Sequence, residues 1–127
     1  MGSDMSVISV DDQITLALSV RDRHASAKWY EDMLGFQLVS HIDEAGWSEL
    51  QTNTKGVTLG LGEQVEPQPG NSVPVFGVAD INVARKALEG AKIQFDGDTV
   101  IIDGMVSLAT FYDPDGNALM IAQNLSV

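Results

Sequence analysis

The sequence repeats one order of predicted elements twice, and this repetition constrains the fold more than any single motif does. A strand that ends at Val20 is followed by Asp22, and another strand that ends at Val78 is followed by Asp80. An aspartate in this position is a typical helix N-cap. Because further strands follow each helix, the sequence predicts an α+β fold made of two βαβββ modules in tandem.

The first module begins with a strand whose residues alternate between apolar and small polar side chains. Over residues 13–20 the apolar side chains share one face, which indicates a strand that packs on a core through that face. The next apolar stripe, over 24–34, has helical spacing and ends at Gly35, a typical residue after a helix C-terminus. Three more strands are predicted over 36–42, 47–52 and 57–62, with turns at 43–46 and 53–56.

The second module follows a stretch, residues 64–72, that contains prolines and a glycine without periodicity and is typical of a linker. We interpret residues 7–124 as one domain, with module one over 12–63 and module two over 73–124. Residues 1–5 are interpreted as an expression-tag remnant. The strands of module two are predicted over 73–78, 92–95, 99–102, 105–112 and 118–124, with a helix after Asp80.

The composition excludes several classes of function. The formal net charge is −11 and there is no cysteine. The chain therefore lacks the basic surface that nucleic acids and anionic lipids require, and it has no thiolate nucleophile or thiolate metal ligand. It has no apolar run of about 18 residues and no secretory leader, so we expect a cytoplasmic protein without membrane contact. The acidic balance fits simple solubility, or a site that attracts a cationic ligand.

The strand faces that point away from the predicted helices carry small side chains. Such faces leave space instead of filling it, and twisted sheets curved around this space would form a cleft, the usual place for a small-molecule site. The small residues on these faces are Thr15, Ala17, Ser19, Thr58, Gly60, Gly62, Gly77 and Thr110.

Larger side chains are predicted to face the same cleft. Trp47, Glu49 and Gln51 alternate with Leu50, which we expect to pack under the helix. A tryptophan beside a carboxylate can stack on a planar or cationic ligand, although a rim or dimer contact is an alternative role for Trp47. The residues predicted to bind a ligand are Thr15, Trp47, Glu49, Gln51, Thr58, Gly60, Val73, Thr110, Tyr112 and Met120.

Three segments together carry a resemblance to a known family. They are Ala27-Lys-Trp-Tyr30, Leu34-Gly-Phe36 and Phe111-Tyr-Asp-Pro-Asp-Gly-Asn117. With them, residues 12–124 resemble the vicinal-oxygen-chelate superfamily, which includes glyoxalase I, extradiol dioxygenases, fosfomycin-modifying enzymes and bleomycin-resistance proteins. The resemblance implies curved mixed sheets around a cleft and a homodimer. It is specific for the fold and not for the function, and we expect Trp29, Tyr30, Leu34 and Phe36 to be core residues.

Metal-dependent members of that superfamily take their ligands from four strand positions. Carried over, these positions fall on Thr15, on Gly60 or Leu59, on Val73 and on Met120. These side chains are not usual ligands for a hard or borderline divalent ion. We therefore expect no metal and no cofactor.

The two histidines are expected to lie at the surface, His24 in a solvated or capping role and His41 at a sheet rim. His24 lies at the start of the first predicted helix, and His41 lies near the end of the second predicted strand. Neither is expected to pair with the other as a metal ligand.

These observations predict a metal-free small-molecule-binding protein that resembles bleomycin-resistance proteins. It would sequester an aromatic or cationic compound, an antibiotic-resistance-like activity without catalytic residues. An alternative is a lyase, isomerase or dioxygenase of the same superfamily, with a metal site not recognised here or with Glu49 as a base. A purely structural or partner-binding domain would instead have a filled cleft.

Overall fold

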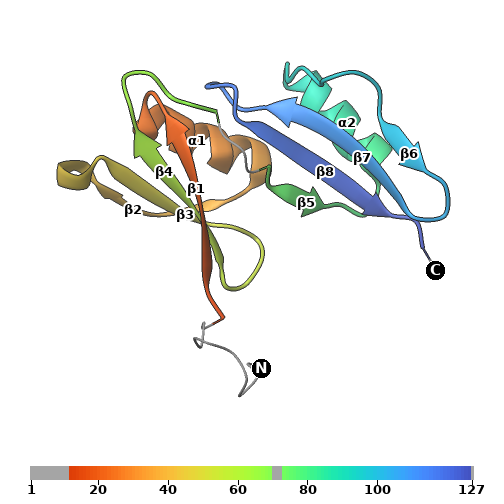
Figure 1. Cartoon of the computed structure of the whole chain (residues 1–127), viewed down its shortest axis with the longest axis horizontal. Coiled ribbons are helices and arrows are strands. Elements are labelled where there is room, and N and C mark those ends of the chain that lie inside the picture. Colours follow the sequence, from red (N-terminus) through yellow and green to blue (C-terminus); the bar gives the residue numbers. More distant parts are fainter. Residues whose placement is uncertain (1–11, 70–72, 127) are drawn as a thin grey trace.

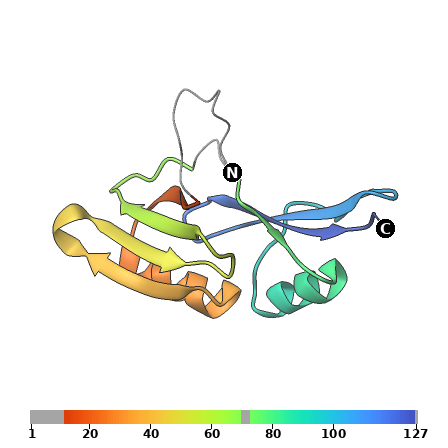
Figure 2. The ribbon, with the colours of Figure 1, turned by 90° about the horizontal axis from the view of Figure 1, so that it is seen from below.

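The computed structural model describes residues 12–69 and 73–126. Within these residues the chain forms two four-stranded mixed sheets, and one helix packs on each sheet (Figures 1 and 2). This confirms the predicted α+β fold with two modules in tandem. The predicted tag remnant at residues 1–5, and residues 70–72 of the predicted linker, lie outside the described residues.

Sheet A is built by the first half of the chain and has the strand order β1-β4-β3-β2. β1 and β4 are parallel, and the other two pairs are antiparallel. Its elements are β1 (Ile14–Val20), α1 (Arg23–Leu34), β2 (Gln37–Ile42), the short 3-10 helix η1 (Asp43–Ala45), β3 (Trp47–Gln51) and β4 (Val57–Glu63).

Sheet B repeats this topology with the order β5-β8-β7-β6, in which β5 and β8 are parallel. Figure 2 shows α1 and α2 on the same side of the two sheets. Each sheet therefore has one face covered by a helix and one helix-free face. The elements of sheet B are β5 (Val75–Gly77), α2 (Ile81–Gly90), β6 (Val100–Ile102), β7 (Val106–Tyr112) and β8 (Ala118–Asn124).

Both helices begin directly after the predicted N-cap aspartates, and α1 ends at the predicted glycine. The Asp22 carboxylate accepts a hydrogen bond from the Ala25 amide, and the Asp80 carboxylate accepts from the Val83 amide. Each bond satisfies a backbone donor that has no partner within the helix. Gly35 ends α1 at φ 72°, in the left-handed region that glycine tolerates best.

The predicted strand over 92–95 is wrong, and the predicted strand over 73–78 is too long. Lys92 has φ 70°, and the Ile93 amide donates to the Leu88 carbonyl, so the chain is still completing the C-terminal turn of α2. In this segment only Phe95 reaches the sheet, as an isolated bridge to Phe111. Val73 precedes β5 and does not belong to it.

The core lies between the helices and the sheets. Tyr30 and Phe36 are buried, and Trp29 and Leu34 are partly buried against the same core, as predicted. None of the helices in the described ranges is long and apolar enough to cross a membrane. The other large buried side chains include Val20, Leu50, Leu59, Leu61, Phe111, Leu119 and Ile121.

The turn between β7 and β8 joins the two modules through buried hydrogen bonds. The Tyr30 hydroxyl donates to Asp113 Oδ2 at 2.8 Å. The Asn117 side-chain amide donates to the same oxygen at 2.8 Å and to the Ser19 carbonyl at 2.9 Å. Burial, and then the Asp113 charge, raise the pKa of Tyr30 well above its usual range. We call Ser19, Tyr30, Asp113 and Asn117 the inter-module clasp.

Tyr30→Phe should lower the free energy of unfolding by about 1.5–3 kcal/mol, because it removes a buried hydrogen bond to a charged group. Tyr112→Phe is the matched control, since the Tyr112 hydroxyl donates to Asp96 at an exposed position. Its effect should stay below about 0.5 kcal/mol. Denaturant unfolding of both variants measures the difference, and equal losses would contradict the role of the clasp.

Candidate functional site

Six of the ten residues predicted to bind a ligand lie on the helix-free face of sheet A. The register sets Thr15 beside Thr58, and Thr58 beside Gln51. Two residues along, Glu49 pairs with Gly60. Residues directly opposite in adjacent strands share a face. The alternate residues of β3 and β4, which include Leu50 and Leu59, are buried under α1. Of the two candidates for the second metal-ligand position, Gly60 lies on the helix-free face and Leu59 belongs to the core.

Trp47 lies against the backbone of β4. A Cβ atom at Gly60 would overlap the six-membered ring of Trp47, and at Gly62 it would lie 3.8 Å from that ring. The missing side chains therefore let the indole lie over the strand. The Trp47 indole N–H donates to Glu49 Oε1 at 3.3 Å, and both side chains are half-buried. This arrangement is an aromatic platform with a carboxylate at its edge, which suits a planar or cationic ligand.

The remaining polar side chains on this face are partly engaged. The hydroxyl oxygens of Thr15 and Thr58 are 2.8 Å apart and share a hydrogen bond. The Gln51 amide nitrogen donates to backbone carbonyls of the β3–β4 turn at 3.0–3.2 Å. Gln51 therefore supports the turn through its nitrogen and presents only its oxygen to a ligand.

The other four predicted residues lie at sheet B. The register places Met120 between Val75 and Thr110 on the helix-free face. Tyr112 shares that face and is exposed, and its hydroxyl donates to Asp96 Oδ2 at 2.9 Å. Val73 precedes β5 and is exposed. The structure thus divides the predicted residues between two sheets that lie side by side (Figure 1).

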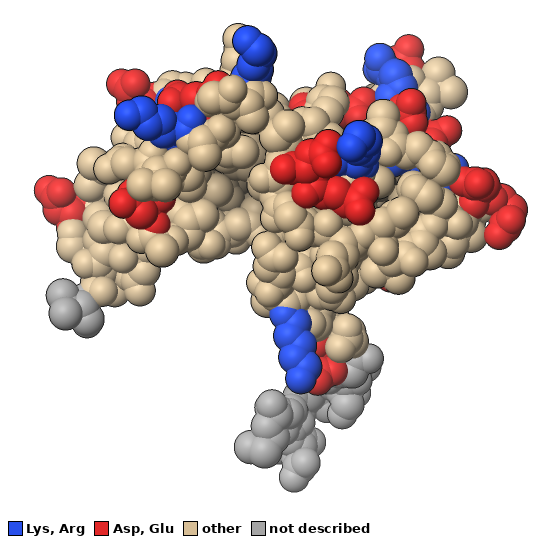
Figure 3. Space-filling view, turned by 180° about the vertical axis from the view of Figure 1, so that it is seen from behind, with Lys and Arg blue, Asp and Glu red and all other residues tan. Residues whose placement is uncertain are grey.

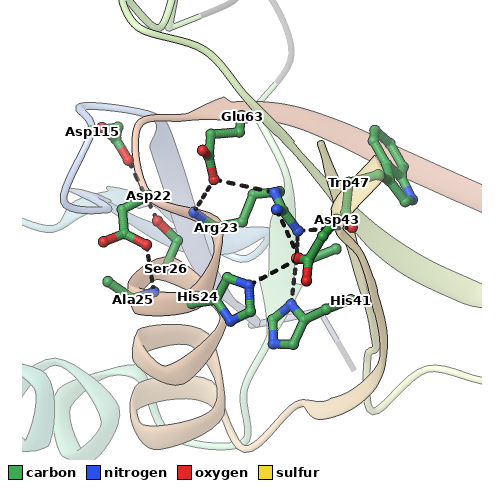
Figure 4. A network of polar contacts seen from close by, with 11 residues as sticks. Asp22, Arg23, His24, Ala25, Ser26, His41, Asp43, Trp47, Glu63 and Asp115 are labelled. Carbon is green, nitrogen blue, oxygen red and sulfur yellow. Dashed lines mark hydrogen bonds and ion pairs between the residues drawn. The ribbon is translucent and has the colours of Figure 1, made fainter. Parts of the chain in front are cut away.

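The sequence did not indicate a charged cluster at the N-terminus of α1. Arg23 is only 5% exposed, and its guanidinium donates to Glu63 Oε1, the Trp47 carbonyl, Ser48 Oγ and Asp43 Oδ1 at 3.0–3.1 Å (Figure 4). Because one of these bonds ends on the Trp47 carbonyl, Arg23 fixes the start of β3 and hence the backbone of the platform.

The two histidine side chains lie against each other, a contact that the sequence did not predict. His24 and His41 stack with ring centroids 3.8 Å apart. His24 Nε2 lies 3.1 Å from Asp43 Oδ1, and His41 Nδ1 lies 2.6 Å from Ser48 Oγ. Hydrogen bonds from Arg23 and then His24 lower the pKa of Asp43.

This cluster does not form a hydrolytic site. A serine hydroxyl next to a histidine is the arrangement of an activated nucleophile. Ser48, however, is fully buried and also accepts a hydrogen bond from Arg23. A substrate cannot reach its Oγ atom, so the cluster is structural.

The four positions that the resemblance assigns to metal ligands do not fit a metal ion here. The Thr15 hydroxyl is bonded to Thr58, Gly60 has no side chain and lies under Trp47, and Met120 offers only a thioether. Carboxylate and imidazole ligands, which divalent ions prefer, are missing from these positions. Among residues 12–69 and 73–126, no group of three histidine, aspartate or glutamate side chains could hold a metal ion.

The chain is similar to a known protein superfamily over most of its length. The model of the Glyoxalase/Bleomycin resistance protein/Dioxygenase superfamily matches residues 12–121. No curated protein matches the chain.

Three solved structures illustrate the likeness of the fold. The antibiotic-binding protein TnmS3 from Streptomyces is 20% identical over 94% of this chain and 98% of its own, with a TM-score of 0.74. A glyoxalase family protein from Bacillus anthracis is 15% identical over 94% and 99%, with a TM-score of 0.74. An integron cassette protein from the metagenome of the Halifax Harbour sewage outfall is 24% identical over 87% and 97%, with a TM-score of 0.75.

Gly60→Ala should displace Trp47, because the new methyl group would overlap the indole ring. We expect a loss of about 1–3 kcal/mol in the free energy of unfolding and a shifted Trp47 indole N–H resonance. Gly77→Ala is the control, since a Cβ atom there meets no atom within 4 Å. An unchanged indole resonance in Gly60→Ala would contradict the platform geometry.

Proposed function

Because the chain belongs to the Glyoxalase/Bleomycin resistance protein/Dioxygenase superfamily, we propose that it binds a planar aromatic or cationic small molecule on the helix-free face of sheet A. It sequesters this molecule without transforming it and acts in the cytoplasm. The observation that carries the proposal is the platform formed by Trp47 over Gly60, with Glu49 at its edge.

The chemistry of the platform favours a cation with a flat apolar body. The indole face attracts positive charge, and a carboxylate beside it adds a direct ion pair. The net charge of −11 raises the local concentration of cations around the protein. The small residues Thr15, Ala17 and Ser19 continue the same face and leave room beside the indole.

The residues present favour capture over catalysis. Thr15, Gly60, Val73 and Met120 supply no carboxylate or imidazole that would polarise a substrate through a metal. Glu49 is an acidic side chain at the platform, and it accepts the indole N–H of Trp47. The similarity to an antibiotic-binding protein supports ligand capture by this fold.

We further propose that a second copy of the chain covers the helix-free face of sheet B. This face is apolar and open: Val100 is 57% exposed, Ile102 43% and Tyr112 41%. A large exposed apolar patch commonly marks an interaction surface. In a homodimer this face would meet the ligand face of the partner, so that Thr110, Tyr112 and Met120 complete the site.

Proflavine, a planar aromatic cation, tests the proposed function. Wild-type protein should bind it with a micromolar Kd, and Glu49→Gln should weaken binding by about tenfold through loss of the ion pair. Glu31→Gln is the matched control, because it removes the same charge from an exposed position of α1, which packs on the other face of sheet A. Dialysis against a chelator should leave the Kd unchanged.

Absence of saturable binding, or equal losses in the two glutamate variants, would reject the platform as the ligand site. Release of a modified dye or of another product would favour the enzymatic alternative.

The dimer should be visible by light scattering after size exclusion. Ile102→Glu should shift the protein to a monomer, because it places a charge on the open face of sheet B. Ile101→Glu is the control, since neighbouring residues of a strand point to opposite faces and Ile101 is also exposed. A monomeric wild-type protein at micromolar concentration would contradict the proposal.

A further inference from the structure

A cavity lies between the two modules, on the side of the sheets where the helices pack. Figure 3 shows it as a notch bordered mainly by uncharged residues. Its volume is about 380 Å³, within the range of small-molecule sites. None of the ten residues predicted to bind a ligand lines it. Its walls are Met33, Leu34, Phe36, Thr52, Asn53, Thr54, Val75, Phe76, Gly77, Val78, Ala84, Ala87, Leu88 and Ile121.

The lining of this inter-module cavity favours a neutral ligand. No residue in it carries a charge, although the chain has a net charge of −11. Phe36 and Phe76 meet edge to face with centroids 5.5 Å apart, and Leu88 and Ile121 are buried residues of the wall. Desolvation of a charged group against such a wall would be unfavourable.

The free edge of β5 adds polar groups to this apolar wall. β5 is the terminal strand of sheet B. The Met120 amide donates to the Pro74 carbonyl, and the Val78 amide donates to the Ala122 carbonyl. In a parallel pair only alternate residues bond to the neighbouring strand. The backbone groups of Val75 and Gly77 therefore point away from β8, and both residues line the cavity.

Gly77 makes this edge easy to approach. A Cβ atom at Gly77 would meet no atom within 4 Å, so a ligand can come close to the backbone there. Across the cavity, the Asn53 side-chain nitrogen donates to the Leu34 carbonyl, which leaves the Asn53 oxygen as an acceptor. The cavity thus combines an apolar wall with a few hydrogen-bond donors and acceptors along its rim.

We propose that the inter-module cavity is a second ligand site, for a neutral, mainly apolar molecule with an amide-like or arylamine group. The apolar part lies against Phe36, Phe76 and Leu88, and the polar group bonds to the backbone edge at Val75 and Gly77. This site is separate from the Trp47 platform, which lies on the other face of sheet A. Because both modules line the cavity, its ligand stabilises their relative position.

The neutral fluorescent probe N-phenylnaphthylamine tests this site. Its fluorescence should increase saturably with one site per chain, and the backbone amide resonances of Val75 and Gly77 should shift. Ala87→Phe should weaken binding by about tenfold or more, because the added ring occupies the cavity from an exposed helix position. Asn82→Phe, at an exposed position of α2 that does not line the cavity, should bind as the wild type does.

Binding in the presence of saturating proflavine, and in Glu49→Gln, should be unchanged, which separates this site from the platform. The proposal is overturned if the probe shows no saturable increase or if Ala87→Phe binds it as tightly as Asn82→Phe. Resonance shifts at Trp47 in place of Val75 and Gly77 would overturn it as well.

Discussion

The position of the two modules depends on one buried carboxylate. Asp113 is 5% exposed and accepts four hydrogen bonds, from the Tyr30 hydroxyl, the Asn117 side chain and the amides of Asp115 and Asn117. A buried charge is tolerated only when such donors surround it. Three of the donors belong to the turn itself, and the fourth, the Tyr30 hydroxyl, comes from the other module. The turn is therefore held by its own hydrogen bonds, and its contact with Tyr30 and Ser19 sets the relative position of the modules and hence the shape of the inter-module cavity.

The two modules share a plan and differ in what they present. In each, the first amide of the helix donates to a side chain near the end of the last strand: Arg23 to Glu63 and Ile81 to Gln123. Module one adds the guanidinium of Arg23, which draws Asp43 and Ser48 into a charged cluster. Module two has the apolar, buried Ile81 at this position. The repeat thus supplies the scaffold, while single side chains decide that the helix-free face of sheet A carries Trp47 and Glu49 and that of sheet B carries exposed apolar residues.

Alternation along the strands was sufficient to predict which residues share a face. Trp47 and Glu49 lie opposite the core residue Leu50 because their spacing of two is a local property of a strand. Contacts between elements distant in the sequence could not be predicted from this local spacing. The stacking of His24 on His41 depends on how the N-terminus of α1 meets the β2–β3 hairpin, and the inter-module cavity depends on the clasp. The strand predicted over 92–95 does not form, because Lys92 and Ile93 complete the C-terminal turn of α2. The composition of this segment is also typical of a strand, so the sequence alone did not distinguish the two structures.

The aromatic platform exists because a side chain is missing from the neighbouring strand. An indole can lie over β4 only where Gly60 leaves the backbone bare. If that bare position moved by two residues along β4, the place where an indole can lie over the strand would move by about 7 Å, and the buried Leu59 and Leu61 would be untouched. An exchange at a single glycine of β4 therefore repositions the aromatic surface of this face, while the residues of the hydrophobic interior stay the same.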